Sequence, residues 1–435
     1  MVPALPEIPH LLGVTANDAS WLVTITLLTS TVGTPIVARM GDMYGRRRML
    51  LLSLLLVAAG SAIAAVTMNF PLVLLGRSLQ GFGAAIIPIG ISIMRDLLSP
   101  AYATTGMALM SGTLGIGSAI GLPTSGVLLE LGGLSAIFWI SAVAATVFLV
   151  LVHRVIPARA DAGGGRFDLI GTLLFTVALS ALLLFISKGA EWGIGHPLTL
   201  ASIAITVLGL SLWVPQQLRI SNPLVDIRST LSRPVLTTNI ATFFIAAGLF
   251  ATHLLTIQEA HAPIATGIGL GMPTLMAGLA ILPFSLIQVV LAPVSARLLI
   301  RFGGKAGLIF GAGMIMFAYT FRFFFHGTLT LVLVGTMLVG VGSAFGFAAM
   351  PILIMDAVPS AEAAAANGLN SLIRNLAGSV TTAAYGFLFL IAPWAGDPTF
   401  LSREGLLLGF AVVALAAAAG MVIAATLPRG SARTV

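Results

Sequence analysis

Long stretches of apolar residues without charge dominate the pattern of this 435-residue chain. The segment from Leu97 to Leu129 contains no Asp, Glu, Lys or Arg, and neither does the segment from Gly405 to Pro428. A hydrocarbon core about 30 Å thick is crossed by roughly 20 apolar residues of helix. Most of these stretches lack the polar stripe at 3.6-residue spacing that a helix of a soluble core shows. The pattern therefore predicts an all-α membrane protein.

Thirteen such stretches are bounded by Gly, Pro or charged residues, and each predicts one membrane span. The predicted spans are Ala19–Ala38, Met49–Thr67, Phe70–Ile93, Thr105–Leu128, Leu134–Val152, Leu169–Ser187, Leu198–Val214, Val235–Ile257, Met272–Val294, Gly307–Phe325, Leu329–Ile354, Leu369–Pro393 and Leu406–Leu427. The loops between them are too short to hold a soluble domain such as an ATPase module.

Composition narrows the class further. Charged residues make up 8% of the chain, against roughly 25% in an ordinary soluble domain. The net charge of +7 does not predict a nucleic-acid partner, because the basic residues recur in the short gaps between spans and form no single patch. The absence of cysteine excludes a disulfide framework and a thiolate metal site. No basic segment followed by an apolar one indicates a cleavable signal peptide. Helical spans also exclude an outer-membrane barrel, whose strands are shorter and alternate.

The basic residues predict the orientation, since Lys and Arg in short loops stay in the cytoplasm. If the loop after the first span is cytoplasmic, 16 of the 21 basic residues fall inside. Lys188, Arg322 and Arg403 fall outside, and Arg77 and Arg374 lie within spans. We therefore expect an inner-membrane protein whose C-terminus is cytoplasmic.

An internal repeat predicts two related bundles. Pro35–Met40 returns as Pro293–Leu298, and Tyr44-Gly45 returns as Phe302-Gly303, all at an offset of 258 residues. Gly81–Ala85 returns as Gly340–Ala344 at an offset of 259. Eight spans separate equivalent positions, and this even number gives both copies the same orientation, as in transporters with parallel repeats.

The repeat predicts an N-terminal bundle over 1–155, two inserted spans with linkers over 156–232, and a six-span bundle over 233–435. The second copy has a span before its repeated loop, whereas the first copy has only Met1–Asp18 there. That segment is too short and too rich in proline to cross. We therefore expect the functional protein to begin upstream, with one further span.

A short basic loop joins the first two spans, and its sequence is Gly41-Asp42-Met43-Tyr44-Gly45-Arg46-Arg47-Arg48. Gly41 and Gly45 allow a tight reversal. The arginines alone would hold the loop at the cytoplasmic face, so the acidic residue Asp42 needs a separate explanation. Asp42 forms either a local salt bridge of about 0–1 kcal/mol or a conformational latch, with its carboxylate against the N-terminus of another helix. The latch is the favoured interpretation.

These residues resemble the major facilitator superfamily, and in particular its fourteen-span drug/proton antiporter branch (EmrB/QacA-type). Gly41-Asp42-x-x-Gly45-Arg46-Arg47 is similar to the signature of the first cytoplasmic loop, and Leu75–Ala85 is similar to the arginine-bearing span motif. Gln258, Pro263, Gly267 and the Ala277–Leu279 stretch also look like that branch. The resemblance covers nearly the whole chain. It implies the major facilitator fold, an absent first span that carries the usual membrane acid, and transport by alternating access.

The resemblance also implies partners for the loop. Asp42 is expected against Ala366–Asn370 at the cytoplasmic start of the twelfth span in outward-facing states. Arg46 or Arg47 is expected to pair with Asp96, the acid at the cytoplasmic end of the third span.

Arg77 lies about seven residues into its span. A charge at that depth costs roughly 2.5–3.5 kcal/mol or more unless it faces a cavity or a partner. It either snorkels to the outer surface or uses the polar and small-residue face that Gln80, Gly81 and Ala84 provide. The resemblance implies that Arg77 takes part in coupling proton and substrate movement.

The fourth span carries Gly117, Gly121, Pro123 and Gly126. It resembles the antiporter signature G-x-x-x-G-P-x-x-G-G but departs from it, because Leu122 stands where the proline is expected and Ser125 replaces a glycine. The alternative is close helix packing by small residues.

Arg374 lies in a polar stripe with Asn367, Asn370, Ser371 and Gly378 at helical spacing. Such a stripe faces the bundle interior or water; the alternative is an interfacial position near the cytoplasmic end. By contrast, acids and histidines at the outer ends of spans are expected to be wet interfacial residues, namely Glu130, His253 and Glu259.

No enzyme signature is present: there is no H-E-x-x-H, no P-loop and no Ser/His pair on neighbouring turns. The sequence predicts a monomeric transporter in the lipid bilayer that exports small amphipathic compounds in exchange for protons, without a cofactor or a metal. The alternatives are a proton-coupled importer, a metabolite exporter of the same fold, or a truncated and inactive transporter.

Overall fold

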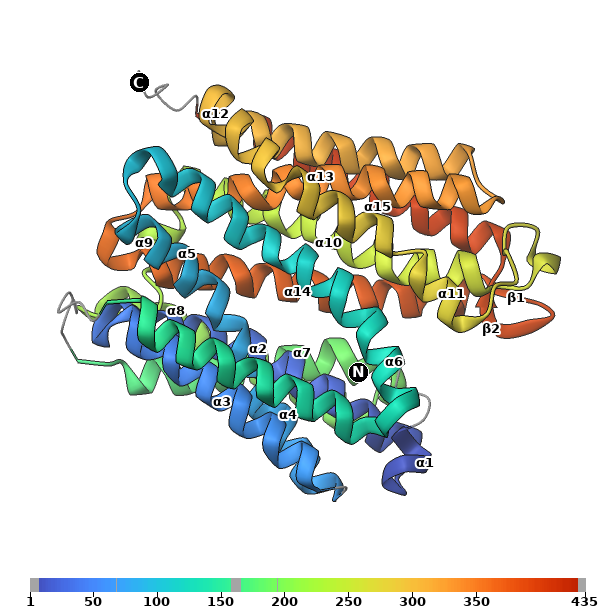
Figure 1. Ribbon diagram of the computed structural model, residues 1–435, viewed down its shortest axis with the longest axis horizontal. Coiled ribbons are helices and arrows are strands. Elements are labelled where there is room, and N and C mark those ends of the chain that lie inside the picture. Colours follow the sequence, from blue (N-terminus) through green and yellow to red (C-terminus); the bar gives the residue numbers. More distant parts are fainter. Residues whose placement is uncertain (1–7, 68, 158–165, 194, 429–435) are drawn as a thin grey trace.

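The computed structural model describes residues 8–67, 69–157, 166–193 and 195–428, and most of them are helical (Figure 1). Helices are the expected outcome, because a helix satisfies the backbone hydrogen bonds of an apolar segment internally. Ten helices of the described residues are long and apolar enough to cross a membrane. One of the ten, residues 276–324, contains two predicted spans. Two more predicted spans, Thr105–Leu128 and Leu369–Pro393, correspond to the first half of α6 and to α14, which are not among the ten.

The N-terminal group of helices runs as far as residue 155. Its elements are α1 (Ile8–Leu12), α2 (Ala16–Tyr44), α3 (Arg46–Val66), α4 (Phe70–Gly81), the 3₁₀ turn η2 (Phe82–Ala85), α5 (Ile86–Leu97) and α6 (Pro100–Val155). The third predicted span is thus interrupted by η2. The fourth and fifth are joined in α6 through a bend at Gly132 and Gly133, whose φ angles are −149° and 65°.

Two further helices follow, α7 (Leu169–Trp192) and α8 (Pro197–Arg219), and then a short turn of helix, α9 (Ile227–Thr230). Asp168 caps α7 by accepting the N–H of Gly171 at 2.8 Å. The side chain of Gln216 on α8 donates to the same carboxylate at 2.9 Å, which ties the two helices together. The helix α7 packs beside α2 and α14, and α8 packs on α7. An apolar cluster that includes Val32, Phe175, Trp213 and Leu372 joins residues of these four helices.

The C-terminal group holds the remaining elements. They are α10 (Arg233–His261), η3 (Ile264–Thr266), α11 (Thr274–Leu279), α12 (Leu282–Phe324), α13 (Leu329–Ala357), η4 (Ser360–Glu362), α14 (Ala363–Ile391), β1 (Pro393–Trp394), β2 (Asp397–Leu401) and α15 (Arg403–Ala425). The helix α12 bends at Gly303, where φ is 82°. The antiparallel β1–β2 hairpin was not predicted from the sequence.

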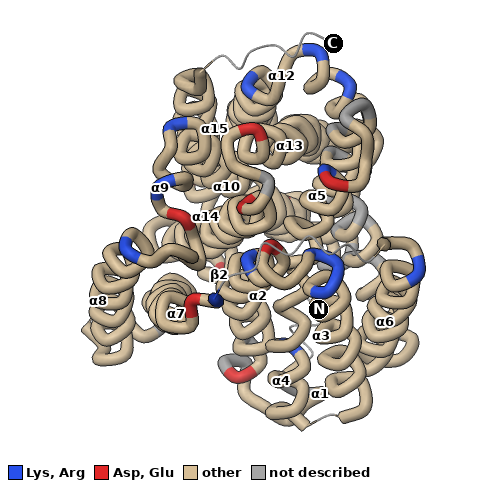
Figure 2. The backbone as a smooth tube through the Cα atoms, turned by 90° about the vertical axis from the view of Figure 1, so that its left-hand side faces the viewer, with Lys and Arg blue, Asp and Glu red and all other residues tan. Residues whose placement is uncertain are grey.

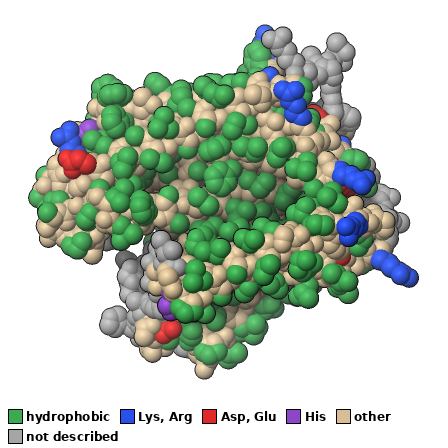
Figure 3. Space-filling model, turned by 180° about the vertical axis from the view of Figure 1, so that it is seen from behind, with side chains coloured by type: hydrophobic (Ala, Val, Ile, Leu, Met, Phe, Trp, Pro, Cys, Tyr) green, Lys and Arg blue, Asp and Glu red, His purple; other side chains and the backbone are tan. Residues whose placement is uncertain are grey.

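The helices lie roughly parallel in two groups, with α7 and α8 beside the N-terminal one (Figures 1 and 2). The largest apolar core lies within the C-terminal group, among α10, α12, α13 and α15. Figure 2 looks onto the end that holds α9 and the turn at Gly45, which we call the predicted cytoplasmic end. Figure 3 shows the surface hollowed between the two groups, with hydrophobic side chains over the hollow. The repeat relationship between the groups stays a prediction.

Candidate functional site

The turn between α2 and α3 consists of one residue. The helix α2 continues through Tyr44, and α3 begins at Arg46, so only Gly45 turns the chain, with φ 108° and ψ 123°. That φ favours glycine because a Cβ is crowded in this region. The expectation that Gly41 also belongs to the reversal was wrong, because Gly41 is helical and lies one turn before the end of α2.

The carboxylate of Asp42 contacts the first turn of α14. It accepts the backbone N–H of Ala365 at 2.8 Å and that of Ala364 at 3.3 Å. The first N–H groups of a helix have no partner within the helix and carry partial positive charge, so they favour an anion. The side chain of Asp42 is buried, with a relative exposure of 6% for the residue.

The contact lies one to two residues before the expected range Ala366–Asn370. The reason is that α14 begins at Ala363, six residues before the predicted start of that span. The structure thus places Asp42 against the N-terminus of this helix, although at different residues from those expected.

Arg46 joins three elements at the same place. Its Nη2 lies 2.8 Å from Oδ1 of Asp42, and its Nε donates to the same oxygen at 3.0 Å. Its Nη1 donates to Asp96 near the end of α5. Arg47 instead donates to the backbone carbonyl of His153 near the end of α6, at 2.7 Å. Of the two expected alternatives, Arg46 is therefore the partner of Asp96.

A close helix crossing accompanies the Asp42 contact. A Cβ added at Gly368 of α14 would lie 2.8 Å from the Cβ of Ala38 and 3.2 Å from the Cα of Pro35, both on α2. Only glycine permits this approach without displacement. Sequence reasoning missed Gly368, although a glycine inside a helix is itself a signal of close approach, because it costs about 1 kcal/mol relative to alanine.

A second contact between the groups is apolar. Ile91 of α5 and Met107 of α6 pack against Met355 of α13 and Ala363 at the start of α14. The two groups of helices therefore meet at the predicted cytoplasmic end through the Asp42 contact, the close crossing at Gly368 and this hydrophobic cluster.

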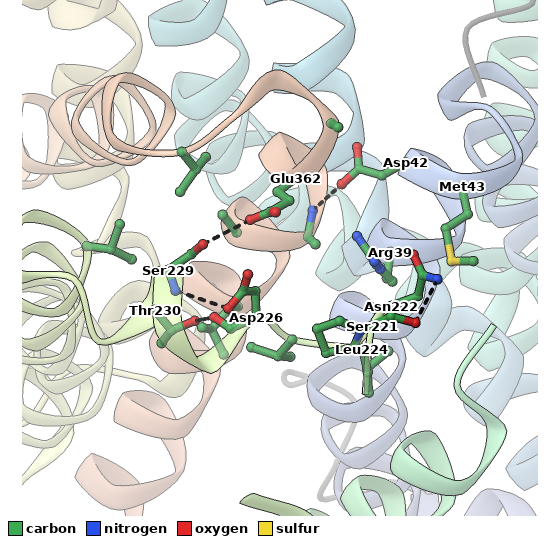
Figure 4. A pocket seen from close by; sticks show the side chains of 18 residues that line it. Arg39, Asp42, Met43, Ser221, Asn222, Leu224, Asp226, Ser229, Thr230 and Glu362 are labelled. Atoms are coloured by element: carbon green, nitrogen blue, oxygen red, sulfur yellow. Dashed lines mark hydrogen bonds between the residues drawn. The ribbon is translucent and has the colours of Figure 1, made fainter. Parts of the chain in front are cut away.

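A cavity of about 210 Å³ lies beside this junction (Figure 4). It is lined by Arg39 and Asp42 of α2, by the segment from Ser221 to Thr230, and by Glu362. The hydroxyl of Ser229 donates to Glu362 at 3.1 Å, and Asp226 caps α9 through the N–H groups of Arg228 and Ser229. The segment that follows α8 is therefore attached to the residue preceding α14.

Arg77 lies on α4 and connects three helices of the N-terminal group. Its Nε donates to the carbonyl of Leu22 on α2 at 3.2 Å, and its Nη1 donates to Oε1 of Gln80. Gln80 in turn donates to the hydroxyl of Ser61 on α3 at 2.8 Å. The Arg77 side chain is partly exposed, and within the described residues it makes no ion pair.

The polar stripe of α14 faces α10 and α13. The Asn370 amide donates to Asn239 at 2.9 Å and to Thr242 at 2.8 Å, both on α10. The Nη2 of Arg374 donates to the hydroxyl of Ser371 at 2.7 Å. Its guanidinium carbon lies 5.5 Å from the ring centroid of Phe347 on α13. Arg374 is the twelfth residue of α14 and lies beside α13, so the interfacial alternative does not describe it.

The glycines of the antiporter-like helix are not at a tight crossing. Gly117 and Gly121 are exposed, and a Cβ at either would meet no described atom within 4 Å. The close-packing alternative therefore does not hold for these two. Pro123 and Gly126 lie in α6, but their side-chain surroundings fall outside the described part of the structure, as do those of Glu130.

The expectation that Glu259 is a wet interfacial residue was wrong. Its carboxylate lies 2.6 Å from Nη2 of Arg322, and both side chains are 1% exposed. Arg322 also donates to Thr256 at 2.9 Å and lies over the ring of Phe410, 4.5 Å from its centroid. Both charges stand near outer ends of helices, but α10, α12 and α15 pack around them and exclude water. His253 is partly buried, with its ring edge against Phe284.

No group of three or more His, Asp or Glu side chains able to hold a metal occurs in the part of the chain described by the structure. The candidate site consists of the Asp42 contact between the two groups of helices and of Arg77 and Arg374, one inside each group.

Known proteins are similar to this chain in sequence and in fold. The chain is 28% identical to multidrug resistance protein Stp of Mycobacterium tuberculosis (strain CDC 1551 / Oshkosh), over 90% of the chain and 72% of that protein. It is also 28% identical to the tetracenomycin C resistance and export protein of Streptomyces glaucescens, over 91% of the chain and 72% of that protein.

Among solved structures, the human organic anion transporter MFSD10 (TETRAN) superposes with a TM-score of 0.67 at 16% identity, covering 97% of this chain and 88% of that one. The family model described as Major Facilitator Superfamily matches residues 1–382. With a match over most of its length and a multi-helix membrane fold, the chain belongs to the Major Facilitator Superfamily of membrane transporters.

Proposed function

We propose that this protein exports small amphipathic compounds across the cytoplasmic membrane in exchange for protons, by alternating access. The observation that carries the proposal is the Asp42 contact with the N–H groups of Ala364 and Ala365, because it joins the end of α2 to the start of α14 across the two groups of helices, at the predicted cytoplasmic end. The names of the relatives, a multidrug resistance protein and an antibiotic resistance and export protein, support the direction of transport.

The contact supports the proposal because it is reversible. An anion on a helix N-terminus is worth about 0.3–1 kcal/mol at an exposed site and up to about 2 kcal/mol in a partly buried one. Coupling energies of this size shift a two-state equilibrium without locking it. The structure then represents the state closed at the predicted cytoplasmic end, and opening that end requires Asp42 to leave α14.

The two enclosed arginines support a polar transport path. A charged side chain within a membrane helix faces the bundle interior or a water-filled cavity. Arg77 occupies such a position in the N-terminal group and Arg374 in the C-terminal group. We assign Arg77 to the coupling of proton and substrate movement, together with Gln80, which orients its guanidinium.

The proposal is tested with the purified full chain in liposomes. A panel of fluorescent amphipathic probes of both charges is offered, and a pH gradient is imposed with and without an uncoupler. We expect at least one probe to move against its own gradient, and the uncoupler to abolish this movement. Equal probe distribution with and without the gradient, for every probe, would refute proton-coupled transport.

A further inference from the structure

Arg374 carries a positive charge well inside the helix α14. It is the twelfth of 29 residues in α14, which places it about 17 Å from the start of the helix at 1.5 Å per residue. Its side chain keeps partial exposure, whereas Ser371 and Gly378 on the same face are buried. The ring of Phe347 on α13 covers one side of the guanidinium. The side chain of Arg374 therefore stays partly accessible, with Phe347 on one side of its guanidinium.

Within the described residues, this guanidinium has no carboxylate partner. Of its five N–H donors, one donates to an acceptor among the described side chains, the hydroxyl of Ser371. Two other arginines of the chain are paired with acids. Arg46 contacts the carboxylates of Asp42 and Asp96, and Arg322 contacts Glu259. No described acid therefore neutralises the charge of Arg374.

The N-terminal group repeats this situation. Arg77 donates to a backbone carbonyl and to Gln80, and it too lacks a carboxylate partner. All acids with described side chains lie outside the helices or within three residues of a helix end: Asp18, Asp42, Asp96, Asp168, Asp226, Glu259, Asp356, Glu362, Asp397 and Glu404. Arg77 and Arg374 therefore lie farther from the helix ends than any acid with a described side chain.

Physical chemistry then selects a ligand. Arginine keeps its charge at any physiological pH, and an unpaired charge away from bulk water is costly. A carboxylate or sulfonate offsets that cost, and a carboxylate fits the guanidinium fork with two parallel hydrogen bonds. An amphipathic cation in the same place meets electrostatic repulsion instead, and nothing described offsets it.

We propose that the transported compounds carry an anionic group, a carboxylate or a sulfonate, which binds to Arg374, and that the apolar surroundings exemplified by Phe347 accept the remainder of the molecule. This inference rests on the proposed function and names its substrate class. It assigns Arg374 as a specificity-determining residue that touches the substrate, distinct from the coupling role of Arg77.

The test compares two probes with the same ring skeleton and opposite charge, the anion fluorescein and the cation rhodamine 123. Binding to the purified full chain in detergent is followed by fluorescence anisotropy. We expect fluorescein to bind at least tenfold more tightly than rhodamine 123. Tighter binding of rhodamine 123 by the unmodified chain would overturn the inference without any variant.

Variants locate the effect. Arg374→Gln is expected to weaken fluorescein binding at least tenfold and to leave rhodamine 123 binding unchanged or stronger. Arg374→Lys keeps the charge but not the fork, so it should retain part of the preference. The control is Arg297→Gln, which removes the same charge from an exposed position. Equal weakening of both probes by Arg374→Gln, or the same effect from the control, would refute the assignment.

The same probes separate this inference from the proposed function. Gradient-driven transport of rhodamine 123 but not of fluorescein would keep proton-coupled export and refute the anionic substrate class. Transport of neither probe, nor of any other in the panel, would refute export, while the binding ratio would still decide whether Arg374 holds an anion.

Discussion

The carboxylate of Asp42 and the backbone N–H of Ala365 are 323 residues apart in sequence and 2.8 Å apart in the structure. The first belongs to the end of α2, and the second to the first turn of α14. Because Arg46 holds Asp42 from the other side, the carboxylate stays oriented toward the helix. Any motion that separates the two groups of helices at this end must break this hydrogen bond, which gives the contact its expected influence on transport.

Replacing Asp42 with Asn should shift the protein toward the state open at the predicted cytoplasmic end. Asn keeps one acceptor oxygen but loses the charge, and hydrogen bonds to charged groups are worth about 1.5–3 kcal/mol. We expect roughly a tenfold loss of transport at an unchanged membrane level. The chain has no cysteine, so Tyr44→Cys and Ala361→Cys, both exposed, allow spin labels to report the distance. An unchanged distance distribution would contradict the latch.

Gly368→Ala should act in the same direction by steric means. The new Cβ lies 2.8 Å from the Cβ of Ala38, and overpacking of this kind costs about 1–3 kcal/mol. We expect the same spin-label pair to show a larger distance and transport to fall. Gly386→Ala on the same helix is the matched control, because no atom lies within 4 Å of its Cβ. If both variants transport equally well, the close crossing is not required.

Local sequence predicted the elements better than it predicted their contacts. Asp42 and Arg46 could be recognised as candidate site residues from the sequence, because both belong to one short motif in the basic loop. The start of α14 was predicted six residues late, since Ala363–Ala366 is neither strongly apolar nor charged. The high helix propensity of alanine was the signal that could have extended it.

Contacts between distant helices were less accessible from the sequence. Glu259 and Arg322 stand 63 residues apart, each near the outer end of a helix, where an isolated charge is normally hydrated. Their burial depends on how α10 packs against α12, which hydrophobic periodicity does not determine. Opposite charges near the outer ends of two helices in one group were the available signal.

Removing one partner of that ion pair should destabilise the protein strongly. Glu259→Ala leaves Arg322 buried without its carboxylate, which costs about 3–5 kcal/mol for a buried pair. The double variant Glu259→Leu with Arg322→Met should be less destabilised than Glu259→Ala, because no buried charge remains. Thermal unfolding in detergent measures both, with Glu404→Gln, which neutralises an exposed acid, as control. A midpoint for Glu259→Ala equal to that of the control would show that the pair adds no stability.

Replacing Arg77 separates coupling from structure. Arg77→Ala removes the donors to Leu22 and Gln80, and we expect it to abolish gradient-driven transport while the protein still reaches the membrane. Arg77→Lys keeps the charge, but its single ammonium cannot reproduce the planar fork, so transport should be impaired as well. A loss of folding alone would lower the amount in the membrane, whereas a loss of coupling leaves probe binding intact and makes probe movement insensitive to the uncoupler. Both quantities are measured on the same membranes. Full gradient-driven transport by Arg77→Ala would contradict the coupling role and favour the alternative, in which the Arg77 side chain only extends toward the outer surface.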